Sequence, residues 1–286
     1  MPELPEVHTT VEGLKKVIIG KTIENVWSDF YIGAKHNDRQ NIKNKKYFEK
    51  FKKIVTGTNI KDIERRGKNI LINLNNDYTI VVHMKMTGNL MYGLYPENKF
   101  IHLKFNLSDK KDLVLADMRK FASVDIFKTE ELKQHKRIGT LGSEPLDPKF
   151  TAKKFFKIFH TKKYPIKSAL MEQNLLSGIG NIYSDEILWE VSIHPLSRTD
   201  KIPEKQFTEI FKTMQKILKF SIKEGGDSKS DYRNAFGEKG NFQNFHNVYS
   251  RKGDKCPKSK CRGIIERMVI KGRSAHFCPN HQLIYK

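Results

Sequence analysis

The first six residues, Met-Pro-Glu-Leu-Pro-Glu, carry the most distinctive chemistry of the chain. If the initiator methionine is removed, Pro2 becomes the N-terminus and its ring nitrogen becomes a secondary amine. Such an amine can attack the aldehyde carbon of a sugar and form a covalent iminium intermediate. An α-amino group titrates at about 8, against about 10.4 for lysine, so more of it is neutral near pH 7. Glu3 can donate or accept the protons that sugar opening and elimination require.

Three cysteines and one histidine near the C-terminus have the spacing of a metal site. Cys256, Cys261, Cys278 and His281 form a Cys-x4-Cys and Cys-x2-His pattern. Three thiolates and an imidazole complete a tetrahedron around zinc and leave no open position, which is typical of a structural ion. A disulfide framework is disfavoured because the cysteines are odd in number and clustered. The residues between the two ligand pairs predict a small hairpin with Arg273 near its tip.

The charge of the whole chain limits its partners. Lys and Arg number 53 against 32 Asp and Glu, which gives a formal net charge of +21 over 286 residues. A surplus of this size predicts a polyanionic partner, either nucleic acid or an anionic membrane. The sequence contains no run approaching about 18 apolar residues, the minimum for a membrane span, and no recognisable signal peptide. We therefore expect a soluble, intracellular protein.

Periodicity divides the chain into a strand-rich part and a helical part. Apolar residues at helical spacing predict a helix that carries Pro2 at its head and stops near Gly20. Short apolar segments separated by turns then predict an antiparallel sandwich or barrel. The clearest strands are expected at 69–74, 78–84, 100–107, 113–117 and 121–127. Residues 28–50 are polar and allow no assignment.

The second part of the chain begins with a segment that contains several glycines and prolines, and helical periodicity follows it. Its longest periodic segment, residues 207–222, predicts a helix that ends at Gly225-Gly226. The expected domains are a strand-rich domain at 1–128, a linker at 129–150, a helical domain at 151–250 and a zinc finger at 251–286.

One glycine-rich turn, Gly178-Ile179-Gly180-Asn181, lies between two helical segments. The amides that open the following helix can hold a phosphate, and the same turn also fits a plain helix connection. Nearby Lys162, Lys163 and Lys167 favour the phosphate interpretation.

Several short motifs occur in the order found in one known enzyme family. They are Pro-Glu-Leu-Pro-Glu-Val at 2–7, Arg-Arg-Gly-Lys at 65–68, His-Met-Lys-Met-Thr-Gly at 83–88, Asp-Met-Arg-Lys-Phe at 117–121 and Gly-Ile-Gly-Asn-Ile-Tyr at 178–183. With the basic finger, the whole chain resembles the formamidopyrimidine-DNA glycosylase family of bifunctional glycosylase/AP lyases, which is related to endonuclease VIII. The resemblance implies an α+β fold, with an N-terminal antiparallel β-sandwich led by a helix, a helical helix–two-turn–helix domain and a β-hairpin zinc finger.

The resemblance also implies catalytic roles for the matching residues. Pro2 is the nucleophile that attacks the sugar C1′ and forms a Schiff base, and Glu3 is the acid that opens the sugar ring. Glu6 supports the site, and Lys68 assists β-elimination. Arg273 serves δ-elimination and binds phosphate.

A second set of matching residues is implied to bind DNA. Met86, Arg119 and Phe121 fill the gap left by the extruded base and face its former partner. Base flipping costs a few kcal/mol of stacking, which a thioether, a guanidinium and an aromatic ring can replace. Lys162 and Asn181 hold the DNA backbone.

The chain departs from the family pattern at several places. The first knuckle of the finger is widened to Cys-x4-Cys and its last ligand is His281, although a longer knuckle can still close a tetrahedron. The family His-x-His tract appears as Phe100-Ile101-His102, which removes one expected DNA contact and leaves His102. The usual Arg-Arg-Phe-Gly appears as Arg119-Lys120-Phe121-Ala122.

The resulting hypothesis is a base-excision repair enzyme that removes oxidised purines from duplex DNA and cleaves the abasic strand by β,δ-elimination. Leu4 favours this branch over the endonuclease VIII branch, so oxidised pyrimidines are the alternative substrates. A non-catalytic DNA-binding relative is the alternative of another class. We expect a monomer in the bacterial cytoplasm, associated with the nucleoid, with one structural zinc and a loop near 225–240 that closes over the flipped base.

Overall fold

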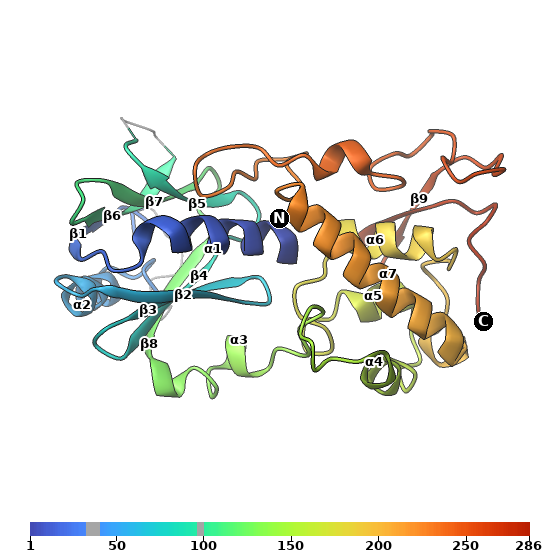
Figure 1. The fold of residues 1–286 in the computed structure, drawn as a ribbon, viewed down its shortest axis with the longest axis horizontal. Coiled ribbons are helices and arrows are strands. Elements are labelled where there is room, and N and C mark those ends of the chain that lie inside the picture. The colour runs from blue at the N-terminus through green and yellow to red at the C-terminus, as the bar shows by residue number, and fades with distance from the viewer. Residues whose placement is uncertain (33–40, 96–99) are drawn as a thin grey trace. The chain divides into compact units, whose positions relative to one another are not determined.

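The computed structural model describes residues 1–32, 41–95 and 100–286 (Figure 1). Contacts divide the chain into two compact units. The first unit contains residues 1–139 and 224–241, and the second contains 140–223 and 242–286. The sequence-based boundaries differ from this division, because they assign segment 224–241 to the helical domain. Residues 33–40, part of the stretch 28–50 that received no assignment, lie outside the described residues.

The first unit is a β-sandwich that begins with a helix. Its helices are α1 (Leu4–Ile18), α2 (Lys45–Val55) and α3 (Lys136–Gly139), with a 3-10 turn η1 (Thr129–Glu131). Its strands are β1 (Ile23–Ser28), β2 (Ile60–Arg66), β3 (Asn69–Leu74), β4 (Tyr78–His83), β5 (Gly88–Gly93), β6 (Ile101–Leu107), β7 (Asp112–Asp117) and β8 (Ser123–Lys128).

The strands form two four-stranded antiparallel sheets, in the orders β1-β6-β7-β5 and β2-β3-β4-β8. Apolar residues of both sheets, α1 and α2 join in one buried core. Helix α1 contributes Val7, Val11, Leu14 and Ile18 to that core, which is the face that its periodicity predicts. The predicted sandwich led by a helix is therefore confirmed.

Several elements of this unit had no clear signal in the sequence. The register of β1 shifts between Ile23 and Asn25, and that of β2 shifts between Ile60 and Asp62. Such bulges interrupt the alternation of buried and exposed residues on which strand prediction depends. Helix α2 is highly charged, but it begins at an Asn44 cap that accepts a hydrogen bond from Tyr47 N at 2.9 Å.

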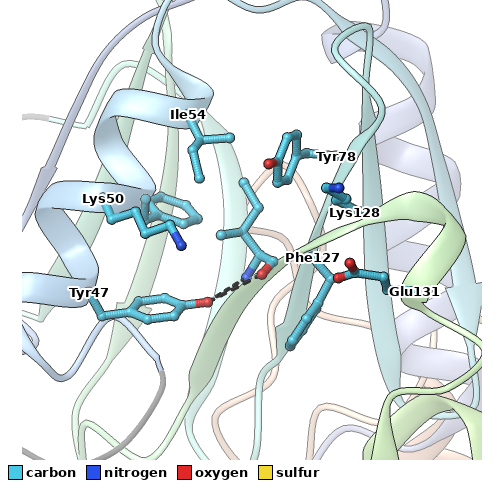
Figure 2. Close-up of a pocket in the computed structure, with 9 residues that line it drawn as sticks. Tyr47, Lys50, Ile54, Tyr78, Phe127, Lys128 and Glu131 are labelled. Carbon is cyan, nitrogen blue, oxygen red and sulfur yellow. Dashed lines mark hydrogen bonds between the residues drawn. The ribbon is translucent and has the colours of Figure 1, made fainter.

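A small cavity lies between α2 and the sheet that contains β4 and β8 (Figure 2). Its volume is about 230 Å³. The Tyr47 hydroxyl accepts a hydrogen bond from Ile126 N at 3.0 Å and so ties the helix to β8 at the cavity wall. The lining residues are Tyr47, Lys50, Phe51, Ile54, Tyr78, Ile126, Phe127, Lys128 and Glu131. None of the site residues predicted from the sequence lines this cavity.

The second unit is helical and ends in a β-hairpin. Its helices are α4 (Ala152–Phe159), α5 (Ile166–Leu170), α6 (Asn181–Glu190) and α7 (Glu204–Lys223), with 3-10 turns η2 (Thr199–Lys201) and η3 (Phe242–Phe245). Strands β9 (Glu266–Ile270) and β10 (Arg273–Phe277) form the antiparallel hairpin. Helix α7 packs against both α4 and α6, and Phe155, Phe159 and Phe207 form an aromatic core between α4 and α7. Within the described ranges, no helix has the length and apolar character needed to cross a membrane.

Candidate DNA-processing site

The start of α1 holds the predicted nucleophile and its two carboxylates in a buried turn. Pro2, Glu3 and Glu6 are all buried, and Glu3 and Glu6 are 2% and 1% exposed. The Glu6 carboxylate accepts a hydrogen bond from Glu3 N at 2.7 Å, which fixes the backbone next to Pro2. Pro5 is tolerated in this first turn because the N–H that it lacks has no partner within the helix.

Glu6 also joins α1 to segment 224–241 within the same unit. Its second carboxylate oxygen accepts from Asp227 N at 2.8 Å, and its carbonyl accepts from the Tyr232 hydroxyl at 2.9 Å. Burial raises the pKa of Tyr232, so its hydroxyl stays a donor at neutral pH. Gly226 has a φ of +84°, and a Cβ there would lie 3.0 Å from Glu6 Cγ. Both facts explain why glycine occupies this position.

Segment 224–241 is anchored along its length to α1 and β5. Asn89 donates to Asp231 O at 3.0 Å and accepts from Arg233 N at 2.7 Å. The Ala235 carbonyl accepts from Tyr92 N at 2.8 Å. A side chain at Gly13 would place its Cβ only 2.8 Å from that of Ala235, so this glycine lets the segment lie close against α1.

Lys68 occupies the two-residue turn between β2 and β3. Arg66 and Asn69 are paired at the ends of the strands, and Gly67 has a φ of +57°. The turn is further held by Arg65, which donates to the Gly67 carbonyl at 3.0 Å. Lys68 is only 6% exposed. Helix α1 packs against both β2 and β3, the two strands that this turn connects.

His83, at the end of β4, is a half-buried neutral base in a cationic environment. Burial, together with the charges of Lys85, Arg137 and Lys68, lowers its pKa to about 3. Its Nδ1 accepts a hydrogen bond from Lys85 N at 3.0 Å. The imidazole therefore remains uncharged at neutral pH and does not add to the positive charge around Lys68.

The three residues expected to fill the gap in DNA gather on one exposed surface. Met86 and Phe121 are each 46% exposed. The Arg119 guanidinium lies 4.3 Å from the centre of the Phe121 ring, and its Nη1 lies 3.5 Å from Met86 Sδ. The structure thus brings Met86 together with two side chains that follow it by 33 and 35 residues in the sequence.

Asp117 holds the loop that carries two of these side chains, and the sequence analysis gave it no role. It is fully buried. One carboxylate oxygen accepts from the Thr87 hydroxyl and from Arg119 N at 3.2 Å, and the other accepts from Ala122 N at 2.7 Å. An aspartate that binds backbone amides a few residues ahead is a common turn signal, and this signal was available in the sequence.

His102 lies in a different environment from the other expected DNA contacts. Its side chain is 8% exposed, and its Nδ1 lies 2.8 Å from Asp29 Oδ1. The ring also packs edge-on against Phe30. In this position His102 connects β6 to the residue that follows β1, and its expected contact with DNA stays a prediction.

In the second unit, Asn181 begins helix α6 directly after the glycine turn. Gln173 orders the turn by accepting from Gly178 N at 2.9 Å and donating to Ile179 O at 2.7 Å. The first amides of α6 are therefore presented at a helix N-terminus, where phosphate binds well. Lys162 follows α4 and is partly exposed. Lys167, by contrast, is 1% exposed and paired with Asp185 at 2.5 Å, so the phosphate interpretation does not extend to it.

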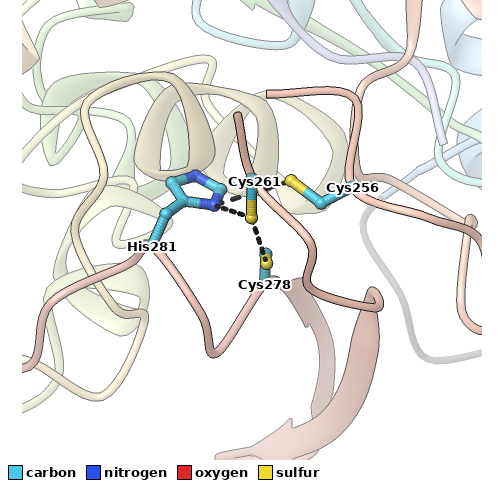
Figure 3. A group of neighbouring side chains, drawn as sticks. All are labelled: Cys256, Cys261, Cys278 and His281. Atoms are coloured by element: carbon cyan, nitrogen blue, oxygen red, sulfur yellow. Dashed lines mark hydrogen bonds between the residues drawn. The ribbon is translucent and has the colours of Figure 1, made fainter. Parts of the chain in front are cut away.

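The four predicted metal ligands converge at the base of the hairpin (Figure 3). Their ligand atoms all lie within 4.8 Å of one another. His281 Nδ1 lies 3.5 Å from Cys256 Sγ, and Cys261 Sγ lies 3.6 Å from Cys278 Sγ. A tetrahedral zinc with bonds of about 2.0–2.3 Å places its ligand atoms roughly 3.5–3.8 Å apart. The donor set and its spacing therefore fit zinc.

The surroundings of this cluster explain how a widened first knuckle still closes. Lys260 adopts a φ of +61°, which turns the chain back toward the second cysteine. Gly263 packs so tightly that a Cβ would lie 2.5 Å from Cys278 Sγ. From α6, Trp189 donates its indole N–H to Cys256 Sγ at 3.4 Å and offers its carbonyl 3.3 Å from His281 Nε2. These contacts orient His281 so that Nδ1 faces the metal.

Three family models match the chain in succession. The N-terminal domain of formamidopyrimidine-DNA glycosylase matches residues 1–124, and the H2TH domain of the same enzyme matches residues 141–233. The zinc finger found in FPG and IleRS matches residues 253–280. With the ligand geometry, this last match establishes Cys256, Cys261, Cys278 and His281 as a structural zinc site.

Curated relatives and solved structures agree over the full length. The formamidopyrimidine-DNA glycosylases of Lactobacillus helveticus and Streptococcus pneumoniae are 37% and 36% identical, covering 100% and 99% of both chains. The Lactococcus lactis enzyme superposes with a TM-score of 0.87, both as a variant bound to Fapy-dG DNA and bound to abasic-site DNA. Sequence identity is 32% and 33%, over 98% of this chain and 99% of the other. This chain therefore belongs to the formamidopyrimidine-DNA glycosylase family.

Proposed function

We propose that this protein excises oxidised purines, such as 8-oxoguanine and formamidopyrimidines, from duplex DNA and then cleaves the abasic strand. It is a bifunctional DNA glycosylase and AP lyase. The observation that carries this conclusion is the family match over the whole chain combined with the buried Pro2-Glu3 stretch at the head of α1. The Lactococcus relative is described bound to Fapy-dG and abasic-site DNA, which supports a damaged purine as the substrate.

The catalytic roles follow from the chemistry of the N-terminal stretch. Removal of Met1 leaves the Pro2 nitrogen as a secondary amine that attacks C1′ and forms a Schiff base while the damaged base leaves. Glu3 supplies the proton that opens the sugar ring. Glu6 acts as a support, because both of its carboxylate oxygens already accept backbone hydrogen bonds. Lys68 assists proton removal in β-elimination.

DNA binding draws on both units and on the charge of +21. Met86, Arg119 and Phe121 fill the space of the extruded nucleotide, since they form one exposed group of a thioether, a cation and a ring. Asn181 and Lys162 hold phosphates of the damaged strand. Arg273 binds phosphate and serves δ-elimination. Zinc supplies structure to the finger and takes no part in the chemistry.

Borohydride trapping on abasic-site DNA, followed by peptide mapping, tests this proposal. We expect the protein to become covalently linked through residue 2, and a variant that retains an N-terminal extension to remain unlinked. A non-catalytic relative would bind the duplex without being trapped. Competition between duplexes with oxidised purines and oxidised pyrimidines then separates the two substrate classes. We further propose that the protein acts as a monomer associated with the bacterial nucleoid.

A further inference from the structure

Asp185 lies fully buried in α6 and bonds two elements of the second unit at once. One of its carboxylate oxygens lies 2.5 Å from Lys167 Nζ on α5. The other accepts from the backbone N–H of His276 at 3.0 Å and lies 3.1 Å from His276 Nδ1. His276 belongs to β10, 91 residues further along the chain. The aspartate therefore connects the core of the helical unit to the finger hairpin.

Two further contacts hold the same hairpin closer to its tip. Asn181 donates its side-chain N–H to Ser274 Oγ at 3.0 Å. The Lys271 ammonium lies 4.2 Å from the centre of the Tyr164 ring, a cation–π distance. The tip itself is a two-residue turn in which Lys271 and Gly272 have φ of +45° and +75°, the combination of a type I′ hairpin. The hairpin is thus anchored at three successive points that do not include the zinc ligands.

Side chains alternate between the two faces of β10, and the anchored residues lie on the face opposite Arg273. Ser274 and His276 are two residues apart and so project from the same face of the strand, and both bond α6. Arg273 projects from the other face and is exposed. Its location therefore depends on how the strand is fixed, since its own side chain is not enclosed by the unit.

We propose that Asp185 is a positioning residue for strand cleavage: it fixes one face of β10 to α6, so that the opposite face presents Arg273 at a constant place. This proposal rests on the function proposed above for Arg273. Zinc closes the base of the finger, whereas Asp185, through His276, sets the part of the hairpin that reaches the DNA.

Single-turnover cleavage of abasic-site duplex at saturating full-length, zinc-loaded protein tests the proposal. The products of β- and δ-elimination are separated on a gel, and trapping at Pro2 is measured in parallel. We expect His276→Phe to lower the ratio of δ to β rates about tenfold, within the roughly 10²-fold loss that a 1 Å displacement can cause. Trapping should keep its wild-type rate. His276→Asn should restore the ratio, because its amide N–H can replace the ring Nδ1–H donor.

The same measurements in an Arg273→Ala background show whether the effect passes through Arg273. If Asp185 and His276 act only by placing the guanidinium, His276→Phe should cause no further loss in this background. Additive losses, a parallel fall in trapping, a wild-type ratio in His276→Phe or loss of zinc from that variant would each overturn the proposal. His276→Phe keeps the buried Lys167–Asp185 pair, so the test does not depend on whether Asp185→Asn folds.

Hydrogen exchange at the amides of 273–277 measures the anchoring without reference to activity. Exchange should accelerate in Asp185→Asn and His276→Phe and remain unchanged in Arg273→Ala. Unchanged exchange in both anchor variants would overturn the proposed anchoring. If exchange accelerates in the two anchor variants but Arg273→Ala keeps the wild-type rate of δ-elimination, the proposed anchoring stands and the role proposed for Arg273 is wrong.

Discussion

Asp117 in the first unit and Asp185 in the second are both fully buried, and each holds a segment that carries an exposed arginine. Asp117 accepts from amides two and five residues ahead and from the Thr87 hydroxyl. Asp185 accepts from a strand 91 residues away and is paired with a buried lysine. The first aspartate orders a local turn, whereas the second connects distant parts of the chain.

The difference shows two ways in which the charge of a buried carboxylate is compensated. A turn can satisfy a carboxylate with its own backbone amides, because the donors are brought close by the turn itself. The distant hairpin offers Asp185 the backbone N–H and the Nδ1 of His276, and the buried cation Lys167 balances the negative charge of this carboxylate. The long-range anchor therefore depends on a charge balance that the local turn does not need.

The largest expected effect is that of Asp185→Asn on stability. Removing one member of a buried ion pair leaves Lys167 without compensation, and we expect a loss of about 3–5 kcal/mol in the free energy of unfolding. Urea denaturation measures this loss. The double variant Lys167→Met/Asp185→Asn should regain most of it, because no isolated charge remains. Equal losses in the two variants would show that the pair does not dominate the energetics.

Asp117→Asn should have a smaller effect, about 1–3 kcal/mol, because an amide group then faces donors that the carboxylate accepted. We also expect weaker discrimination between bases opposite the lesion, with borohydride trapping retained. The matched control is Asp112→Asn on the same strand, where a partly exposed pair with Lys104 is worth at most about 1 kcal/mol. A control that loses as much stability as Asp117→Asn would contradict the special role of this turn.

Tyr232→Phe removes the hydroxyl that joins segment 224–241 to Glu6 O and Thr10. We expect a loss of about 0.5–1.5 kcal/mol, the usual contribution of one hydrogen bond. Faster amide exchange should be confined to the segment and the first turn of α1. Unchanged exchange there would mean that the contacts with Asn89 and Tyr92 are sufficient to hold it.

The smallest effect at neutral pH is expected for His83→Asn, since His83 is already uncharged. Its folded pKa of about 3 lies below the ordinary histidine value of 6.5, so the unfolded chain binds a proton that the folded protein excludes. Stability should therefore be complete above about pH 6.5 and fall progressively toward pH 3. In His83→Asn this contribution to acid sensitivity should disappear, as measured by urea denaturation between pH 7 and 4. An unaltered pH dependence would show that His83 is protonated without cost.

Residue pattern alone predicted the leading helix and the zinc ligands, because each depends on local spacing. It left a sandwich and a barrel open, and only the family resemblance specified the sandwich. Val7, Val11 and Leu14 lie one helical turn apart, and the ligands come in two short pairs. Strands β1 and β2 were not among the clearest predicted strands, and each contains a register shift that disturbs the alternation.

The long-range partners of the site could not be predicted in the same way. No local pattern relates Asp185 to His276 or Glu6 to Tyr232, since each pair exists only after distant segments have packed. Lys167 illustrates the same limit, because in the sequence it is indistinguishable from the partly exposed Lys162. Only burial separates a structural lysine from one that is available to a phosphate.

The contacts of Glu6 have a consequence for the biosynthesis of the protein. Asp227 and Tyr232 follow Glu6 by 221 and 226 residues, so both arrive late in translation. Domains generally fold as the ribosome releases them, from the N-terminus onward. Here the first turn of α1 must wait for segment 224–241, and the surroundings of Glu6 are completed only after Asp227 and Tyr232 have been synthesised.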